Sequence, residues 1–234
     1  MIVLLFGAPG CGKGTQAAEL ANRLEVPSIS TGDMFRAECQ AGTELGKRAQ
    51  AILASGGLVG DEIVNQMVAS RTAREDCEKG FILDGYPRTV RQAEFLDGML
   101  KQRGLSDPLV VHLVVGEEAL VERLTARRYC PQCRSIYNVR SQPPRMDGRC
   151  DRDGAALLTR EDDHESVIRE RLAAYEAATS PVLKWYGSAK THRIDGAQDA
   201  VSVAAAIERV LIKRRKRRPV VAVANSTSVP TGTY

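Results

Sequence analysis

The sequence predicts an α/β fold in which a parallel five-stranded sheet is flanked by helices. Three observations carry this prediction. Short apolar runs alternate with helical stretches, the first apolar run leads into a glycine-rich loop, and two insertions interrupt the alternation. Such alternation is typical of a parallel sheet covered by helices on both faces. A chain of 234 residues, 43% of them hydrophobic, is long enough to bury a substantial core in one such domain with insertions.

The strands are predicted from short apolar runs, and the first of them, residues 2–6, is apolar throughout, as is typical of a strand buried on both faces. The five predicted strands cover residues 2–6, 27–30, 80–83, 109–115 and 192–195. Helical stretches are predicted between them, at 61–74, 89–103, 116–126, 165–178 and 198–212.

Two segments break the alternation. Residues 31–59 hold short helices separated by glycines, and residues 127–163 hold four candidate metal ligands, a Pro-Pro pair and few apolar runs. We interpret both segments as insertions at the carboxyl edge of the sheet, because open α/β folds bind their ligands there.

A glycine-rich loop follows the first strand and reads G-A-P-G-C-G-K-G-T-Q at residues 7–16. Its glycines let backbone N–H groups approach phosphate oxygens, the helix that follows adds positive potential, and Lys13 supplies a mobile cation. The spacing matches the P-loop, except that Gly14 stands where a Ser or Thr usually binds Mg²⁺, and Thr15 comes one place later. The loop predicts binding of a nucleoside triphosphate. The residues expected to bind it are Gly10, Cys11, Gly12, Lys13, Gly14 and Thr15.

A second motif begins with an apolar strand that ends in Asp84. A carboxylate in this position orients Mg²⁺ or its waters in the Walker B arrangement. The alternative is that Asp84 only caps a helix, but the P-loop favours the functional interpretation. Gly85 permits close approach of the backbone, and Arg88 is expected beside the phosphates.

Three motifs in this order resemble those of the adenylate kinase family. They read G-A-P-G-C-G-K-G-T from Gly7, S-T-G-D-M-F-R from Ser30 and G-F-I-L-D-G-Y-P-R-T from Gly80. The resemblance extends from Met1 to about Ile212, and it implies Mg²⁺-dependent phosphoryl transfer from ATP to AMP, giving two ADP. It also implies a P-loop kinase core at 1–29, 60–126 and 164–212, a mobile AMP-binding domain at 30–59 and a mobile lid at 127–163.

The resemblance assigns phosphate contacts to six arginines. Arginine suits this chemistry because its planar fork binds phosphate with two hydrogen bonds and keeps its charge. Arg36 and Arg88 are expected to hold the AMP phosphate. Arg123 and Arg127 are expected to meet ATP from the first edge of the lid. Arg160 and Arg171 are expected to close on the transferring phosphoryl group from its second edge. The expected catalytic set consists of Lys13, Asp84, Arg88, Arg123, Arg127, Arg160 and Arg171.

The resemblance also places residues around the two adenine bases. The Thr31 hydroxyl and the Gln92 amide can each donate and accept hydrogen bonds, as the edge of adenine requires. The residues expected at AMP are Thr31, Arg36, Gly57, Leu58, Val59, Gly85, Tyr86, Pro87, Arg88, Gln92, Arg160 and Arg171. Those expected at ATP beyond the P-loop are Arg127, Ile136, Tyr137 and Gln198. The alternative for Gln198 is an ordinary residue at a helix start.

The lid carries the pattern Cys130-x2-Cys133-x16-Cys150-x2-Asp153, which is typical of a zinc ribbon except for its fourth ligand. A carboxylate oxygen is an accepted Zn²⁺ ligand, so these residues predict a closed, structural zinc site in a zinc-ribbon-like lid. Two alternatives are a lid without metal and His164 as the fourth ligand, although the spacing of His164 is wrong. A catalytic zinc is excluded because four protein ligands leave no open position.

Composition indicates an intracellular enzyme. No apolar run approaches the roughly 20 residues that span a bilayer, and the chain starts with a strand in place of a signal peptide. Six cysteines in a long chain with a nucleotide motif favour a reducing compartment. We therefore expect a cytoplasmic monomer without membrane partners.

The net charge of +4 comes from the C-terminal end of the chain. The run 213–218 alone carries six positive charges, so the rest of the chain is net negative and is not a basic nucleic-acid binder. Residues 213–234 are expected to form a disordered tail.

Two other functions stay open at this point. One is a sister nucleoside monophosphate kinase with GTP as donor or with UMP or CMP as acceptor. The other is a zinc-ribbon protein that binds nucleic acid through its basic tail.

Overall fold

The parallel five-stranded sheet predicted from the sequence is confirmed in the computed structural model, which describes residues 1–55 and 57–217. The strand order is β2-β3-β1-β4-β7, and every neighbouring pair is parallel. The bounds differ from the predicted ones by at most one residue at either end. The strands are β1 (Ile2–Phe6), β2 (Ser28–Ser30), β3 (Phe81–Asp84), β4 (Leu109–Val114) and β7 (Thr191–Asp195).

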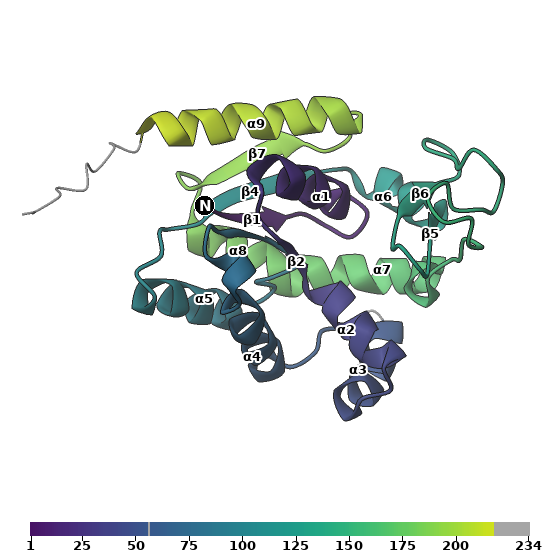
Figure 1. Cartoon of the computed structure of the whole chain (residues 1–234), viewed down its shortest axis with the longest axis horizontal. Coiled ribbons are helices and arrows are strands. Elements are labelled where there is room, and N and C mark those ends of the chain that lie inside the picture. The colour runs from purple at the N-terminus through teal and green to yellow at the C-terminus, as the bar shows by residue number, and fades with distance from the viewer. Residues whose placement is uncertain (56, 218–234) are drawn as a thin grey trace, which may run out of the picture.

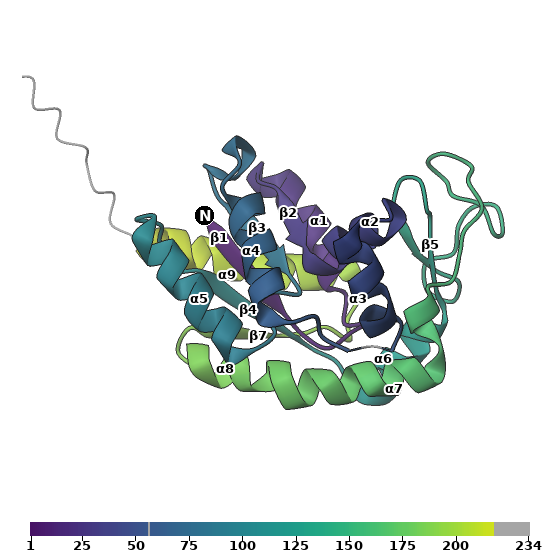
Figure 2. The ribbon, with the colours of Figure 1, turned by 90° about the horizontal axis from the view of Figure 1, so that it is seen from below.

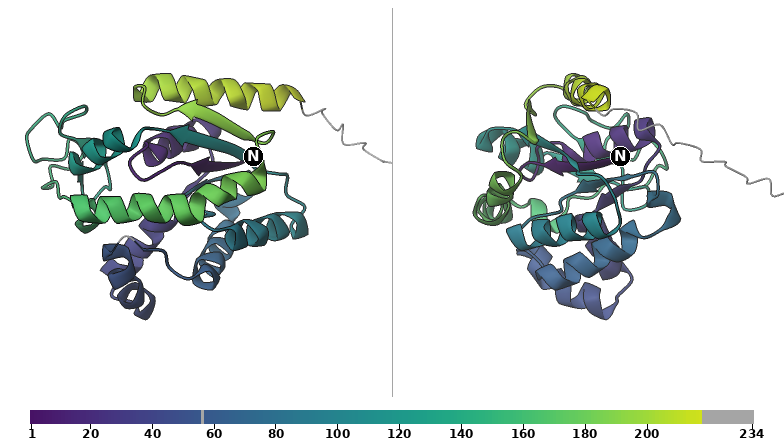
Figure 3. Two further views of the ribbon diagram at one scale, coloured as in Figure 1. Left: turned by 180° about the vertical axis from the view of Figure 1, so that it is seen from behind. Right: turned by 90° about the vertical axis from the view of Figure 1, so that its left-hand side faces the viewer.

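Helices cover both faces of this sheet (Figures 1 and 3). One layer contains α1 (Lys13–Leu24) and α9 (Ala200–Arg217), and the opposite layer contains α4 (Asp61–Thr72), α5 (Val90–Gln102) and α8 (Ser180–Tyr186). Successive residues of β1 alternate between the two layers. Val3 and Leu5 pack with the α1–α9 layer, whereas Leu4 and Phe6 pack with the opposite layer. Because both faces are covered, the strand is apolar along its whole length.

Both insertions lie at the end of the molecule to which the strands point with their carboxyl ends (Figures 1 and 2). The first contains α2 (Thr31–Gln40) and α3 (Glu44–Ala54). The second follows α6 (Glu117–Thr125) and contains an antiparallel hairpin of β5 (Arg127–Tyr129) and β6 (Ile136–Asn138). It ends in the short 3-10 helix η2 (Glu161–Asp163), which contacts α3. The two insertions therefore meet across the carboxyl edge of the sheet.

The predicted helix 165–178 does not end where expected. It begins as α7 (Glu165–Ala174), widens into the π-helical turn η3 (Tyr175–Thr179) and continues into α8. Pro181, at the start of α8, has no N–H for an ordinary helical hydrogen bond, and a wider turn before it accommodates the missing bond.

The C-terminal helix corrects the expected start of the tail. It was predicted to end at residue 212, but α9 continues to Arg217, so disorder is the wrong expectation for residues 213–217. Leu211 is buried in the α1–α9 layer, and the Arg214 guanidinium donates to the main-chain carbonyls of Asp107 and Pro108. Residues 218–234 of the predicted tail lie outside the described residues. Among the described residues, no helix has both the length and the apolar character needed to cross a membrane.

Two helical glycines should respond in opposite ways to alanine. A Cβ atom on Gly46 of α3 would lie 2.2 Å from the carbonyl oxygen of Glu38 on α2, whereas a Cβ on Gly98 of α5 would meet no atom within 4 Å. We expect Gly46→Ala to lower the free energy of unfolding by roughly 1–3 kcal/mol through overpacking. Gly98→Ala should raise it by about 0.5–1 kcal/mol. Thermal unfolding followed by circular dichroism measures both. A Gly46→Ala variant as stable as the parent would contradict the close packing of α2 and α3.

Candidate active site

The glycine-rich loop between β1 and α1 uses its glycines in two ways. Gly7, Gly10 and Gly12 have φ angles of 146°, 84° and 97°, which favour glycine. Gly7 and Gly10 are packing positions, because a Cβ atom there would lie 2.4 Å from Cys11 Sγ and 2.8 Å from Leu124 Cγ. At Gly12, which precedes the first residue of α1, a Cβ would face open space. No side chain caps this helix, so its first N–H groups can receive an anion.

Lys13 lies across this loop. Its Nζ atom donates to the carbonyls of Gly7 at 2.6 Å and Ala8 at 3.0 Å. The Cys11 side chain is buried in the core, so only its main chain can contact a nucleotide. Gly14 and Thr15 are exposed at the start of α1. The residues predicted to bind the triphosphate therefore form one surface around the helix start.

The end of β3 lies between the P-loop and the α2–α3 insertion. A Cβ on Gly14 of the P-loop would lie 3.6 Å from Asp84 Oδ2, so the carboxylate faces the P-loop. Burial raises the pKa of Asp84 above its usual value, and this effect outweighs the opposite effect of the Lys13 and Arg88 charges. The carbonyl of the next residue, Gly85, accepts hydrogen bonds from Thr31 Oγ1 at 2.9 Å and from Arg88 Nε at 2.8 Å. Asp84 thus belongs to the P-loop side and Gly85 to the side of the α2–α3 insertion.

A pocket opens between this end of β3 and the α2–α3 insertion. It brings together most of the residues predicted at AMP, along with several that were not predicted. Its lining consists of Thr31, Gly32, Phe35, Leu53, Gly57, Leu58, Val59, Val64, Gly85, Arg88 and Gln92. The unpredicted members are apolar residues on the inner faces of α2, α3 and α4. Their helical spacing is a signal for burial but not for a ligand.

Tyr86 and Pro87 support the pocket from behind. The bond between them is cis, both are buried, and the Tyr86 hydroxyl donates to Asn65 Oδ1 at 2.6 Å and to the Gln92 carbonyl at 3.2 Å. The side chain of Tyr86 packs in the core on the α4–α5 face. Its position points to a supporting role, in contrast to Arg88 and Gln92, which line the pocket.

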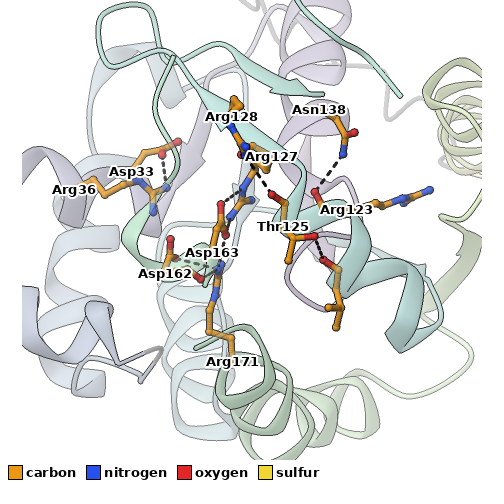
Figure 4. Close-up of polar contacts among 11 residues, drawn as sticks. Asp33, Arg36, Arg123, Thr125, Arg127, Arg128, Asn138, Asp162, Asp163 and Arg171 are labelled. Carbon is orange, nitrogen blue, oxygen red and sulfur yellow. Dashed lines mark hydrogen bonds and ion pairs between the residues drawn. The ribbon is translucent and has the colours of Figure 1, made fainter. Parts of the chain in front are cut away.

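Two of the lid arginines meet on one buried carboxylate (Figure 4). The Asp163 side chain has no exposed surface, and it accepts hydrogen bonds from Arg127 Nε at 2.7 Å and Arg171 Nη1 at 3.1 Å. Arg171 also donates to the Asp162 carbonyl at 2.8 Å and forms an ion pair with the Asp162 carboxylate. The arginines predicted on opposite edges of the lid are therefore held side by side.

Arg160 and Arg36 approach the same region. Burial, together with the nearby charges of Arg127 and Arg36, lowers the pKa of Arg160 to about 10, so it stays charged at neutral pH. Its guanidinium carbon lies 5.6 Å from the ring centre of Tyr129, and its Nε finds no hydrogen-bond partner within the described part of the chain. Arg36 pairs with Asp33, and this arginine overcomes the effect of burial and lowers the pKa of Asp33. Burial also lowers the pKa values of Arg88 and Arg171.

Arg123 differs from the other arginines because it faces the loop after β7. Its guanidinium donates to the carbonyls of Gly196 at 2.8 Å and Ala197 at 2.9 Å. Gln198 follows in this loop, is exposed, and donates to Asp195 Oδ2 at 3.3 Å. Arg123 therefore anchors the segment that carries Gln198.

The predicted metal ligands come together at the tip of the lid. One ligand atom from each of Cys130, Cys133, Cys150 and Asp153 lies within 4.8 Å of all the others. Four tetrahedral ligands of one zinc ion lie roughly 3.3–3.8 Å apart, and the Sγ atoms of Cys133 and Cys150 are separated by 3.4 Å. Three thiolates and a carboxylate therefore fit a closed zinc site in chemistry and in spacing.

Main-chain N–H groups support this cluster. Cys133 N donates to Cys130 Sγ at 3.5 Å, and Arg152 N donates to Cys150 Sγ at 3.4 Å. A residue with positive φ follows each ligand pair: Arg134 at 62° and Gly154 at 72°. Both turns aim N–H groups at the ligands, and such bonds stabilise negative charge on them.

The two lid residues predicted at the ATP base are oriented differently. The Ile136 side chain is exposed, whereas Tyr137 is buried beside the cysteines. The Tyr137 hydroxyl accepts from Asp151 N at 2.8 Å and lies 3.5 Å from Cys150 Sγ. With this hydroxyl engaged inside the lid, any contact of Tyr137 with ATP falls to its main chain.

The carboxylates that hold the site's arginines and Gln92 are the functional residues that the sequence analysis missed. Asp33, Asp162 and Asp163 hold arginines in place, and Asp61 binds the Gln92 amide. Each lies near a predicted arginine or pocket residue in the sequence. This proximity was a usable signal. The Asp33–Arg36 pair is local to α2, whereas the pairing of Asp163 with Arg127 depends on a contact distant in the chain.

Comparison with known proteins agrees with the motifs. A family model described as Adenylate kinase matches residues 5–191. A protein named adenylate kinase from an Anaeromyxobacter species is 53% identical over 188 residues, which cover 80% of this chain and 88% of the relative. One from Anaeromyxobacter dehalogenans is 48% identical over 212 residues, or 90% of this chain and 99% of the relative. One from Thermoanaerobacter pseudethanolicus is 43% identical over 217 residues, or 92% of this chain and the whole relative. The chain therefore belongs to the adenylate kinase family of phosphotransferases.

Proposed function

We propose that this chain transfers a phosphoryl group reversibly between MgATP and AMP, forming two ADP, at the carboxyl edge of its sheet. The observation that carries this proposal is the end of β3. Asp84 faces the P-loop, whereas the next residue, Gly85, lines the pocket of the α2–α3 insertion. Two neighbouring residues therefore join a triphosphate site to a second site, which is the arrangement a direct transfer between two nucleotides needs.

The second site takes AMP in this proposal. Thr31 and Gln92 offer polar atoms to the base, while Phe35, Leu53 and Val64 supply apolar walls. Arg88 lines this pocket, and Arg36 is in α2, the helix that also contributes Thr31, Gly32 and Phe35 to the lining. These two arginines hold the AMP phosphate, because guanidinium groups bind phosphate in a fixed geometry.

ATP occupies the P-loop. Its phosphates receive the N–H groups at the start of α1, and Lys13 turns from the loop carbonyls to the β- and γ-phosphates. Arg127, Arg160 and Arg171 meet the transferring group from the lid. Ile136, the main chain of Tyr137 and the segment of Gln198 border the ATP base, and Arg123 anchors that segment.

The transfer itself requires positioning and charge stabilisation. A phosphate oxygen of AMP attacks the γ-phosphorus of ATP, and the bond from that phosphorus to the oxygen bridging to the β-phosphate breaks, which leaves ADP on both sides. Phosphate oxygens carry no proton that must be removed first, so no general base is needed. Mg²⁺ bound with ATP supplies charge neutralisation, and Asp84 and Thr15 are the residues placed to hold it or its waters.

The lid ion is zinc, and its role is structural. Cys130, Cys133, Cys150 and Asp153 hold it, and its four protein ligands leave no position for a substrate. The lid keeps Arg127 and Arg160 in place, so the ion acts on the reaction only through the order of the lid.

Other parts of the interpretation stay predictions. GTP as donor and UMP or CMP as acceptor are alternatives that a substrate panel distinguishes from ATP and AMP. Cytoplasmic location and a monomeric state are further expectations. Nucleic-acid binding is not expected of the enzyme body, and a secondary role of this kind is left only to the basic tail 213–234.

Lys13→Met tests the donor site. We expect kcat in a coupled assay of ADP formation from ATP and AMP to fall below about a tenth of the parent value, because the cation at the β- and γ-phosphates is lost. The matched control is Lys101→Met, which removes an exposed lysine from the last turn of α5. Parent-like activity of Lys13→Met with an unchanged circular dichroism spectrum would remove Lys13 from the site. No ADP formation by the parent would contradict the proposed function itself.

Asp163→Asn tests the arrangement of the lid arginines. The variant leaves two guanidinium groups without the buried charge between them, and breaking a buried pair in this way costs about 3–5 kcal/mol of stability. We expect a lower melting temperature and a kcat reduced by roughly tenfold or more, since small displacements of positioned groups are costly. Glu161→Gln, an exposed neighbour, should change neither. Equal kinetics for both variants would show that Asp163 does not position the arginines.

Elemental analysis tests the metal. One Zn²⁺ per chain is expected, retained in Asp153→Cys because thiolate is also a zinc ligand, and lost in Cys150→Ala. Stripping the ion should lower the melting temperature, because its binding energy contributes to folding of the lid. Less than about half an equivalent after purification without chelators, or an unchanged melting temperature after stripping, would contradict a structural site.

A further inference from the structure

The Gln92 amide is held at both ends by protein groups before any nucleotide enters. Its Nε2 donates to Asp61 Oδ1 at 2.8 Å, and its Oε1 accepts from the Arg88 main-chain N at 2.7 Å. The second carboxylate oxygen of Asp61 accepts from Thr89 Oγ1 at 3.0 Å. Gln92 is only 2% exposed, so water does not compete freely for these bonds.

These partners determine which way the amide points. A carboxylate only accepts hydrogen bonds, and a main-chain N–H only donates them. Exchanging the nitrogen and oxygen of Gln92 would set an oxygen against Asp61 and an N–H against the N–H of Arg88. Both bonds would become repulsive, so the neighbours allow one orientation of the amide.

The fixed orientation leaves a defined pair of groups for a base in the pocket that Gln92 lines. Each end of a primary amide makes more than one hydrogen bond, so one N–H on Nε2 and one lone pair on Oε1 remain. A 6-aminopurine presents an N–H donor at position 6 beside an acceptor at N1. A 6-oxopurine presents the reverse, an acceptor at position 6 beside an N–H at N1. In a given base pose, the 6-aminopurine therefore pairs with both Nε2 and Oε1 of Gln92. The 6-oxopurine in the same pose places a donor against the Nε2 donor and an acceptor against the Oε1 acceptor, so both contacts are unfavourable.

We propose that Asp61 is a positioning residue that sets the specificity of the acceptor pocket for 6-aminopurine over 6-oxopurine monophosphates. This inference rests on the proposed function, because it assumes that the pocket takes the acceptor nucleotide. Asp61 acts through Gln92: together with the Arg88 main-chain N–H, its contact opposes the amide flip by which glutamine would otherwise accommodate the wrong base. A site whose buried polar groups are left unpaired by a substrate rejects that substrate strongly.

The position of Asp61 suits this role. It is the first residue of α4 and directly follows the pocket segment that contains Gly57, Leu58 and Val59. Glu62 is the second acidic residue in the first turn of α4, but it is exposed and has no contact with Gln92 among the hydrogen bonds of the described residues. Glu62→Gln is therefore a matched control for loss of negative charge at this helix start.

The test compares kcat/KM for AMP with kcat/KM for inosine monophosphate, with saturating MgATP, in the parent and in Asp61→Ala. We expect the AMP-to-IMP ratio to fall by roughly tenfold or more, the scale of losing one hydrogen bond to a charged group. Asp61→Asn should retain most of the preference, since its amide oxygen can still accept from Gln92 and its nitrogen can donate to Thr89. Glu62→Gln should leave the ratio unchanged.

A purely structural role for Asp61 predicts another result, namely kcat/KM reduced equally for both nucleotides with an unchanged ratio, and that result would overturn the inference. Melting temperatures show whether Asp61→Ala is folded. If it is not, Asp61→Leu keeps a similar side-chain volume without an acceptor, and the same fall in the ratio is expected. A parent that fails to phosphorylate AMP would reject the proposed function, whereas an active parent with an unchanged ratio in the variants rejects only the role of Asp61.

Discussion

Asp163 keeps a full carboxylate where solvent does not reach it, and guanidinium groups from β5 and α7 meet on it. Without this negative charge, Arg127 and Arg171 would repel one another in a region that Arg160 and Arg36 also approach. Asp33 does the same for Arg36 on the other insertion. Carboxylates therefore keep the cationic groups together in the absence of phosphate. The burial that lowers several arginine pKa values also means that a phosphate arrives at groups that have already lost part of their water.

Transfer between two nucleotides also requires that their two sites lie next to each other. In the proposed function, the end of β3 joins these two sites. In a parallel sheet, loops from neighbouring strands leave at the same edge, so the loop after β1 and the loop after β3 lie side by side. The glycines at 12 and 85 leave room for backbone or side chains to approach closely on either side. The pocket on the α2–α3 side contains polar residues, such as Gln92, that the surrounding protein orients.

The lid faces a different constraint because it is small and polar. Its buried apolar cluster consists of Cys130, Tyr137 and Cys150, with few partly buried neighbours. So small a core cannot by itself offset the conformational entropy of ordering the segment. An ion held by the four proposed ligands on two turns would meet this need. Tyr137 packs in this cluster and accepts a hydrogen bond from Asp151 in the second ligand loop.

Much of this protein could be predicted from local patterns in the sequence. Some features depend only on neighbours within a few residues, so a local sequence pattern predicts them. They are the five apolar strands, the P-loop, the strand ending in Asp84 and the spacing of the cysteines. Where local patterns failed, the cause was a tertiary contact in one helix and an irregular helical turn in the other. The helix after residue 212 continues because Leu211 packs against the sheet layer and Arg214 reaches the loop before β4. The helix through Tyr175 continues because a wider turn accommodates Pro181.

The candidate site likewise has residues that the sequence predicted and contacts that only the tertiary structure showed. Sequence motifs predicted the arginines, Gln92 and the candidate metal ligands, because phosphate, base and metal chemistry restrict their residue types. Only the tertiary structure decided that Asp163 lies between Arg127 and Arg171, that Tyr137 turns inward, and that Asp61 orients Gln92. The physical reason is that the partner of a buried charge or amide is chosen by proximity in space. These partners lie between 8 and 36 residues apart in the chain, and no local pattern encodes which of them meet.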